Sequence, residues 1–186
     1  MPEEHIVSGF AEVFKHGLIA DKNYWLEAQR AFKNGTFETV VQRSVALKSA
    51  IVEADEKEQG ERKLLNFGHS LGHAVESFFL EKGEPVLHGE AIAAGMMMAA
   101  KLSVERAGLS PKSFDEITQV LRKIYPKLEW QPIDDERILN WLAHDKKNVA
   151  DELRFTLLRE IGDGILDVPV TFKEAASALR WYAESI

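Results

Sequence analysis

The sequence predicts a mainly α-helical protein, a helical bundle with one small β-hairpin near the C-terminus. Three observations favour this fold class. Apolar residues recur at helical spacing in several separate stretches, and residues typical of helix starts and ends stand between these stretches. The period then changes to the strand type between Leu153 and Val170. With 186 residues and 45% hydrophobic content, the chain should form one domain or two small ones and can bury a substantial core.

The first part of the chain predicts three helices. Apolar residues keep helical spacing over residues 3–18, which indicates the first of them. Asp21 is placed to cap a second helix, which should stop at Asn34-Gly35. Thr36 is then expected to cap a long third helix over 36–52.

The rest of the chain follows the same signals. It first predicts a charge-dense loop over 53–63, a histidine-bearing helix that begins near Leu64 and ends at Gly83, and a helix from His88 to just before Gly108. Two further helices are expected, one from Ser110-Pro111 to Ile124 and one from Asp134 that ends near Asn148. The chain then predicts a hairpin over 153–170 with a break at Gly162-Asp163-Gly164, and a last helix opened by the capping box Thr171-Phe172-Lys173-Glu174.

The histidine-bearing helix carries the strongest chemical signal. His69 and His73 are four residues apart and share one helix face, with Gly68 and Gly72 beside them. Each glycine inside a helix costs roughly 1 kcal/mol, so a backbone or ligand is expected to pack closely there. With His88, the histidines indicate a metal or phosphate site. Spacing alone nevertheless favours the alternative, because two histidines at helical spacing are more often solvated or hydrogen-bonded than metal ligands.

Composition excludes several function classes. A net charge of -7 argues against general nucleic-acid binding, and the absence of cysteine restricts a metal to nitrogen and oxygen ligands. The longest uncharged run, residues 91–100, is too short to span a membrane, and the acidic N-terminus does not read as a signal peptide. No glycine cluster follows a strand and opens a helix, as a dinucleotide-binding loop must. We therefore expect a soluble, cytoplasmic protein that does not itself bind NAD.

Four separated motifs resemble those of one enzyme family. They are SGFAEVFKHGLI at 8–19, DEKE at 55–58 followed by Arg62 and LNFGHSLGHAVE at 65–76, HGEAIAAGM at 88–96, and DKKN at 145–148. Their order and residues are similar to the C-terminal, mainly helical domain of 3-dehydroquinate synthase, and the likeness covers nearly the whole chain.

The resemblance implies a lyase of the shikimate pathway. Members of this family convert 3-deoxy-arabino-heptulosonate 7-phosphate into 3-dehydroquinate and phosphate with NAD and one divalent metal, Zn²⁺ or Co²⁺. It also implies that a separate N-terminal NAD-binding domain acts as partner, so the chain alone is expected to be inactive. The remaining surface leaves room for a homodimer.

The resemblance also implies roles for individual residues. It assigns the metal to Glu12, His69 and His88, where spacing alone would have paired His69 with His73. It implies catalytic roles for Lys15 and His73, with His73 close to the metal or relaying a proton. The residues that it assigns to the substrate are Lys48, Arg62, Asn66, Lys146 and Lys147, with one of the last two making the contact.

Two other functions remain open from the sequence. One is a related sugar-phosphate cyclase or a metal-dependent polyol dehydrogenase. Polyol dehydrogenases typically place an aspartate where Glu12 stands, and Arg62, Asn66 and His73 together disfavour them. The other is a non-catalytic zinc-binding helical module, which would close its metal shell with four protein ligands instead of leaving a position open.

Overall fold

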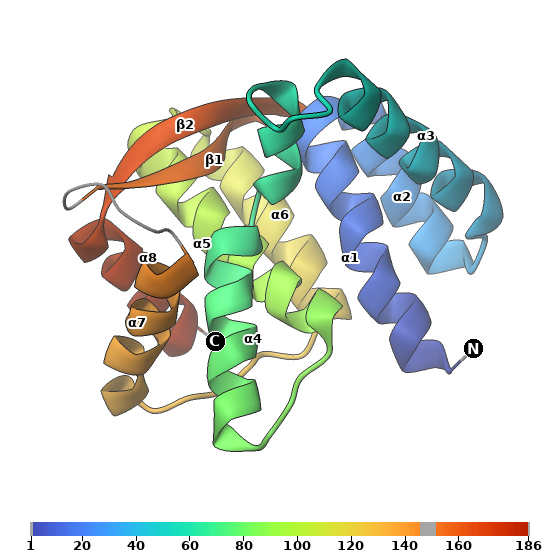
Figure 1. Ribbon diagram of the computed structural model, residues 1–186. Coiled ribbons are helices and arrows are strands. Elements are labelled where there is room, and N and C mark those ends of the chain that lie inside the picture. The colour runs from blue at the N-terminus through green and yellow to red at the C-terminus, as the bar shows by residue number, and fades with distance from the viewer. Residues whose placement is uncertain (1, 146–151, 186) are drawn as a thin grey trace.

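The computed structural model describes residues 2–145 and 152–185, which form a helical bundle with one two-stranded hairpin (Figure 1). This confirms the predicted fold class. The elements in chain order are α1 Glu3–Ala20, α2 Lys22–Asn34, α3 Glu38–Ala54, the 3₁₀ helix η1 Glu61–Asn66, α4 His69–Lys82, α5 His88–Arg106, α6 Pro111–Ile124, the 3₁₀ helix η2 Pro132–Asp134, α7 Asp135–Asp145, β1 Glu152–Glu160, β2 Asp163–Thr171 and α8 Phe172–Glu184.

Most predicted helix caps are present. Asp21 accepts hydrogen bonds from the backbone N–H groups of Asn23 and Tyr24 and so begins α2. Ser110 caps α6, and Thr171 forms the expected capping box at α8.

The predicted cap at Thr36 is wrong. Helix α3 begins at Glu38 after Phe37, without a side-chain cap. The backbone N–H of Thr36 donates instead to the carbonyl of Ala31, 3.0 Å away, and completes the termination of α2.

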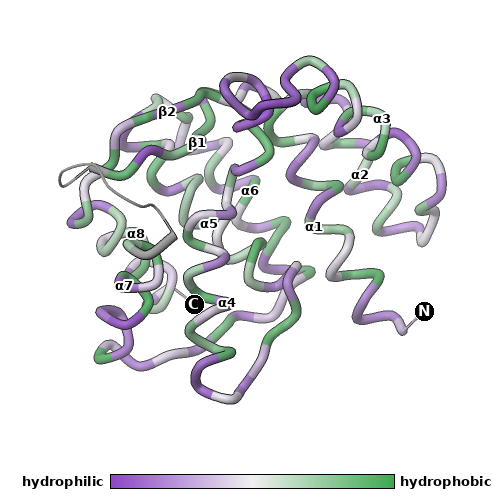
Figure 2. Tube along the Cα trace, in the orientation of Figure 1, coloured by the Kyte–Doolittle hydropathy of each residue, from purple (hydrophilic) through white to green (hydrophobic). Residues whose placement is uncertain are grey.

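Helix α5 forms the centre of the core. Every residue from Ala91 to Ala100 is buried, including Met96, Met97 and Met98, which fill the core as expected from their flexible side chains. Helices α1, α4, α6 and α8 and the hairpin all pack against α5. By contrast, the first part of the connection from α3 to α4 is coloured hydrophilic in Figure 2. Among the described residues, no helix has the length and apolar character needed to cross a bilayer.

The start of α4 differs from the predicted helix. Residues Glu61–Asn66 form a 3₁₀ helix, Gly68 has a φ of +78°, and the α-helix begins only at His69. Gly68 therefore lies in a left-handed turn before the helix, because a glycine adopts this conformation without a steric penalty.

A close backbone neighbour of these glycines is present, as predicted. A Cβ atom built on Gly95 of α5 would lie 2.0 Å from the carbonyl oxygen of Gly68 and 2.6 Å from the nitrogen of Gly72. The backbones of α4 and α5 are therefore in direct contact at the start of α4.

The hairpin covers one end of α5 and contacts the segment before α4. Strands β1 and β2 pair antiparallel as predicted, and the backbone N–H of Leu158 donates to Ser103 Oγ on α5, 3.0 Å away. Thr156 Oγ1 donates to the carbonyl of Lys63 at 2.7 Å, and Lys63 Nζ pairs with Asp167 at 2.7 Å. Through these contacts the hairpin fixes the position of η1, which carries Asn66.

Candidate metal centre

Three histidine side chains meet where α4 and α5 begin. His69 and His88 are the first residues of these helices, and His73 follows one turn into α4. One nitrogen from each ring lies within 4.8 Å of the other two. The ring centroids are 5.1 Å apart for His69 and His73, 5.9 Å for His69 and His88, and 5.8 Å for His73 and His88. The structure thus brings the i, i+4 pair and the distant third histidine together.

Glu12 lies beside this cluster on α1. The first turn of α5 is held to α1 by a hydrogen bond from the backbone N–H of Gly89 to Ser8 Oγ at 2.9 Å. Glu12 follows Ser8 by one turn on the same helix, and its Oε1 lies 3.5 Å from His69 Nε2. The contact between α1 and α5 therefore supplies a carboxylate to a cluster whose histidines come from two other helices.

Glu12 is also paired with Lys15. The ammonium of Lys15 donates to both carboxylate oxygens, at 2.9 Å and 2.8 Å, and Lys15 is only 2% exposed. Burial alone would raise the pKa of the Glu12 carboxyl, but the charge and hydrogen bond of Lys15 outweigh burial and lower it. Glu12 is therefore an anion at neutral pH.

The protonation state of His69 suits metal binding. Burial, and then the charge of Lys15, lower the pKa of His69 to about 4. The imidazole is therefore neutral at pH 7, which is the form that binds a metal. His69 Nδ1 lies 3.3 Å from the carbonyl oxygen of Phe67, and His88 Nδ1 lies 3.1 Å from Glu76 Oε2. Carbonyl and carboxylate partners of this kind orient histidine ligands in metal sites.

The donor set fits a divalent zinc-type ion. Imidazole nitrogens and one carboxylate are the ligands of known catalytic zinc sites, and cobalt accepts the same donors. Four candidate donors are present, Glu12, His69, His73 and His88, of which the resemblance selects three for the metal. The choice between His73 and Glu12 as a ligand stays a prediction.

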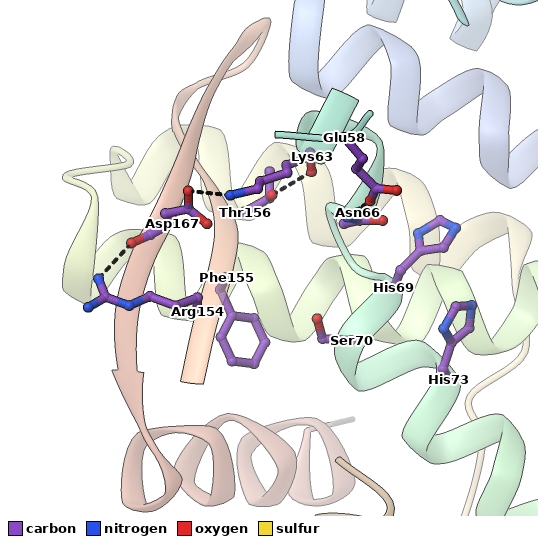
Figure 3. Close-up of a pocket in the computed structure, with 10 residues that line it drawn as sticks. All are labelled: Glu58, Lys63, Asn66, His69, Ser70, His73, Arg154, Phe155, Thr156 and Asp167. Atoms are coloured by element: carbon purple, nitrogen blue, oxygen red, sulfur yellow. Dashed lines mark hydrogen bonds and ion pairs between the residues drawn. The ribbon is translucent and has the colours of Figure 1, made fainter. Parts of the chain in front are cut away.

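A hollow of about 360 Å³ opens beside the histidines (Figure 3). Of the residues predicted from the sequence, His69, His73 and Asn66 line it. Figure 3 shows Arg154, Phe155, Thr156 and Asp167 of the hairpin on one side of this space and His69, Ser70 and His73 of α4 on the other. The lining residues that sequence reasoning missed are Glu58, Lys63, Ser70, Arg154, Phe155, Thr156 and Asp167. Four of these lie on the hairpin, where no local motif marked them as functional.

Lys48 and Arg62 do not line this hollow. The Nη1 atom of Arg62 donates to the carbonyl of Glu56 at 2.9 Å, and its Nε lies 4.0 Å from Glu58. Lys48 is exposed on α3 and lines a separate, largely apolar groove of about 530 Å³ between α1 and α3, which Glu12 also borders. Among the described residues, Asn66 and His73 therefore line the hollow, whereas Lys48 lines the separate groove and Arg62 lines neither.

Two predicted substrate residues lie outside the described part of the chain. Lys146 and Lys147 belong to residues 146–151, between α7 and β1 in the sequence. Their assignment to the substrate stays a prediction.

His16 is a buried histidine next to the site, and we expect it to make the stability of the folded chain depend on pH. It is 2% exposed, and its Nδ1 lies 2.7 Å from Ser44 Oγ. No described residue forms a hydrogen bond with its Nε2. Burial, and then Lys15, lower the pKa of His16 to about 4.

We predict that acid destabilises the metal-free chain partly through His16. The His16 ring takes up a proton near pH 6.5 in the unfolded chain and only near pH 4 in the folded chain. The contribution of neutral His16 to the free energy of unfolding is therefore complete above pH 6.5 and is lost as the pH falls from 6.5 toward 4. Between about pH 7 and about pH 5, the unfolding free energy of the wild type should fall by about 2 kcal/mol more than that of His16→Gln. Urea unfolding in EDTA measures this difference, and equal pH slopes for the two proteins would contradict it. His69 titrates in the same window in both proteins and so cancels.

Comparison with known proteins gives the chain a family. Residues 9–148 match the family model described as 3-dehydroquinate synthase C-terminal. The chain is 36% identical to 3-dehydroquinate synthase of Parabacteroides distasonis over 189 residues, covering 100% of this chain and 54% of the relative. It is 40% identical to the enzyme of Acinetobacter baylyi over 172 residues, covering 89% and 47%. The chain thus spans about half the length of the curated relatives it matches.

Solved structures agree in fold. A 2-epi-5-epi-valiolone synthase from Streptomyces hygroscopicus with NAD⁺ and Zn²⁺ bound is 25% identical, has a TM-score of 0.81, and is covered over 53% of its length by 100% of this chain. A 2-deoxy-scyllo-inosose synthase complexed with carbaglucose-6-phosphate, NAD⁺ and Co²⁺ is 22% identical, with a TM-score of 0.76 over 97% of this chain and 53% of that protein, and shows the fold alone. With the family match and the four sequence motifs, these likenesses establish that the chain belongs to the 3-dehydroquinate synthase family and corresponds to its C-terminal domain.

Proposed function

We propose that this chain is the metal- and substrate-binding half of a 3-dehydroquinate synthase. The reaction is conversion of 3-deoxy-arabino-heptulosonate 7-phosphate into 3-dehydroquinate and phosphate in the shikimate pathway, in the cytoplasm. The convergence of His69, His73 and His88 within 4.8 Å, beside an ionised Glu12, carries the proposal. The match to curated 3-dehydroquinate synthases over the full chain supports this reaction among those of the fold.

Glu12, His69 and His88 would hold the divalent ion, with Zn²⁺ or Co²⁺ as the candidates. When bound, such an ion acts as a Lewis acid that stabilises negative charge on substrate oxygens. The chain contributes an anionic carboxylate and a His69 imidazole that is already neutral, so binding does not require this ring to lose a proton. Three protein ligands from three helices would leave a coordination position for the substrate, as catalytic zinc sites do.

The other residues of the site would bind and orient the substrate. His73 borders the hollow beside the proposed metal ligands and would move a proton at a substrate oxygen. Asn66 lies on the same wall and would hydrogen-bond a hydroxyl or phosphate oxygen. Lys48, Arg62 and one of Lys146 and Lys147 would supply positive charge for the carboxylate and phosphate of the substrate.

NAD and a second domain complete the proposed enzyme. Two structural neighbours carry NAD⁺ and a metal, and this chain covers about half of each. We propose that an N-terminal NAD-binding domain supplies the hydride acceptor opposite the metal, since the sequence of this chain has no dinucleotide-binding loop. Homodimer formation through the remaining surface is part of the same proposal.

The second candidate is a related sugar-phosphate cyclase acting on another phosphate. The likeness in fold to a valiolone synthase and an inosose synthase favours this alternative over a polyol dehydrogenase. The metal site would be shared, and the substrate-contacting residues would differ.

We predict that the isolated chain binds zinc but does not release phosphate from the heptulosonate phosphate in the presence of NAD. In the proposed reaction NAD accepts a hydride from the substrate, so the substrate cannot be oxidised when NAD is not bound. The test incubates the chain with Zn²⁺, NAD and substrate, alone and with the separately expressed N-terminal half of the Parabacteroides distasonis relative, and follows phosphate by a colorimetric assay.

The outcomes of this test distinguish the candidates. Phosphate release only in the combined sample supports the proposed reaction. Release by the chain alone at a comparable rate would contradict the need for a second domain. Turnover of other six- or seven-carbon sugar phosphates, but not of the heptulosonate phosphate, would favour the related cyclase.

A further inference from the structure

The ammonium of Lys15 occupies the oxygens of Glu12 that a metal would use. It donates to both, at 2.9 Å and 2.8 Å, and Oε1 is also the atom that faces His69 at 3.5 Å. The two residues are one helical turn apart on α1, so the helix itself keeps the cation next to the carboxylate. The charge of the Glu12 carboxylate is therefore already balanced by the Lys15 ammonium of the same chain.

Lys15 has little freedom to leave this position. Its side chain is 2% exposed, whereas that of Glu12 is 30% exposed. Among the described residues, Glu12 is the only acid within salt-bridge distance of Lys15, and the other charge acting on it, Lys48, is positive. An ammonium that lost Glu12 here would be buried without a counterion, which is strongly unfavourable.

We propose that Lys15 is a tethered cation that competes with the divalent ion for Glu12 and so weakens metal binding until an anionic ligand arrives. The inference rests on the proposed metal site. A divalent ion on Glu12 would stand within a few ångströms of the ammonium, and like charges at that distance in a partly buried site repel. A carboxylate, phosphate or ionised hydroxyl of the substrate would give Lys15 a new partner and remove this repulsion.

The consequence is a reciprocal coupling between metal and anionic ligand. If the anion relieves Lys15, it tightens metal binding, and by linkage the metal tightens the anion by the same factor. Lys15 would thus make full occupancy of the site depend on both ligands.

The test compares Zn²⁺ and Co²⁺ affinity of the metal-free chain by isothermal titration calorimetry at neutral pH. Lys15→Met keeps length and suits burial, and it should bind either ion about tenfold more tightly than the wild type. Lys33→Met is the control, since it removes an exposed lysine of α2 that belongs to no part of the proposed site, and its affinity should stay within about threefold. Combined with Glu12→Gln, Lys15→Met should no longer increase affinity.

Equal or weaker binding by Lys15→Met would overturn the inference, because Lys15 would then be indifferent or would hold Glu12 in place for the metal. Circular dichroism checks folding, and Lys15→Gln serves as a second neutral variant for which the same increase is expected. Failure of the wild type and both neutral variants to bind either ion would instead remove the metal site, and with it the proposed function.

Discussion

Replacing His69 or His88 by alanine should abolish tight metal binding and, in the two-domain enzyme, turnover. Protein zinc sites bind with about 10–16 kcal/mol shared among about four ligands, so loss of one ligand should weaken binding by about a hundredfold or more. Both rings lie in the histidine cluster, and His69 is also the histidine next to Glu12. Metal content after dialysis, together with Co²⁺ absorption spectra, measures the effect.

His73→Ala is the informative companion to these two variants. If Glu12, His69 and His88 form the ligand set, His73→Ala should keep its metal and lose activity, because His73 then acts on the substrate. If the three histidines are the ligands, His73→Ala should lose metal like the others, and Glu12→Gln should retain it. The second pattern would contradict the ligand set that the resemblance implies.

Local sequence patterns predicted most of the helices and part of the site. Helical spacing placed His69 and His73 on one face, and the capping box at Thr171 marked the start of α8. These signals depend on neighbours within four residues, so they hold whatever the tertiary structure. Thr36 shows the limit of this reasoning, because the same residue suits a helix start and the termination of the helix before it.

The arrangement around α4 depended on backbone geometry that spacing does not reveal. The prediction of a helix that begins near Leu64 assumes one continuous α-helix, but η1 has a 3₁₀ period and Gly68 has a φ of +78°. Asn66 lines the hollow in this arrangement, and Arg62 does not.

The hairpin residues that line the hollow could not be predicted from the sequence around them, for a different reason. Thr156 and Lys63 are 93 residues apart, and Lys63 and Asp167 are 104 apart, yet both pairs are in direct contact. Only the packed structure brings the hairpin against the hollow, since nothing within either segment specifies its partner.

The glycines of α4 and α5 lead to the largest stability effect that we predict. In Gly95→Ala, the new methyl would lie 2.0 Å from the carbonyl oxygen of Gly68 and 2.6 Å from the nitrogen of Gly72. Both are backbone atoms and cannot rotate away, so α4 and α5 must separate. Overpacking of a core typically costs about 1–3 kcal/mol, and a backbone clash of this depth should reach at least the upper end. This exceeds the gain of about 1 kcal/mol from replacing a helical glycine by alanine.

Gly9→Ala is the matched control, because Gly9 also lies inside a helix but a Cβ atom there meets nothing within 4 Å. It should stabilise the chain by up to about 1 kcal/mol, whereas Gly95→Ala should destabilise it by at least about 2 kcal/mol in urea unfolding with EDTA present. Since Gly68 directly precedes His69, separating the helices should also move His69 and His73 away from His88. Gly95→Ala should therefore lose metal affinity even under conditions where it remains folded. If both variants were equally stable and bound metal equally well, the contact between α4 and α5 would not be what holds the three histidines together.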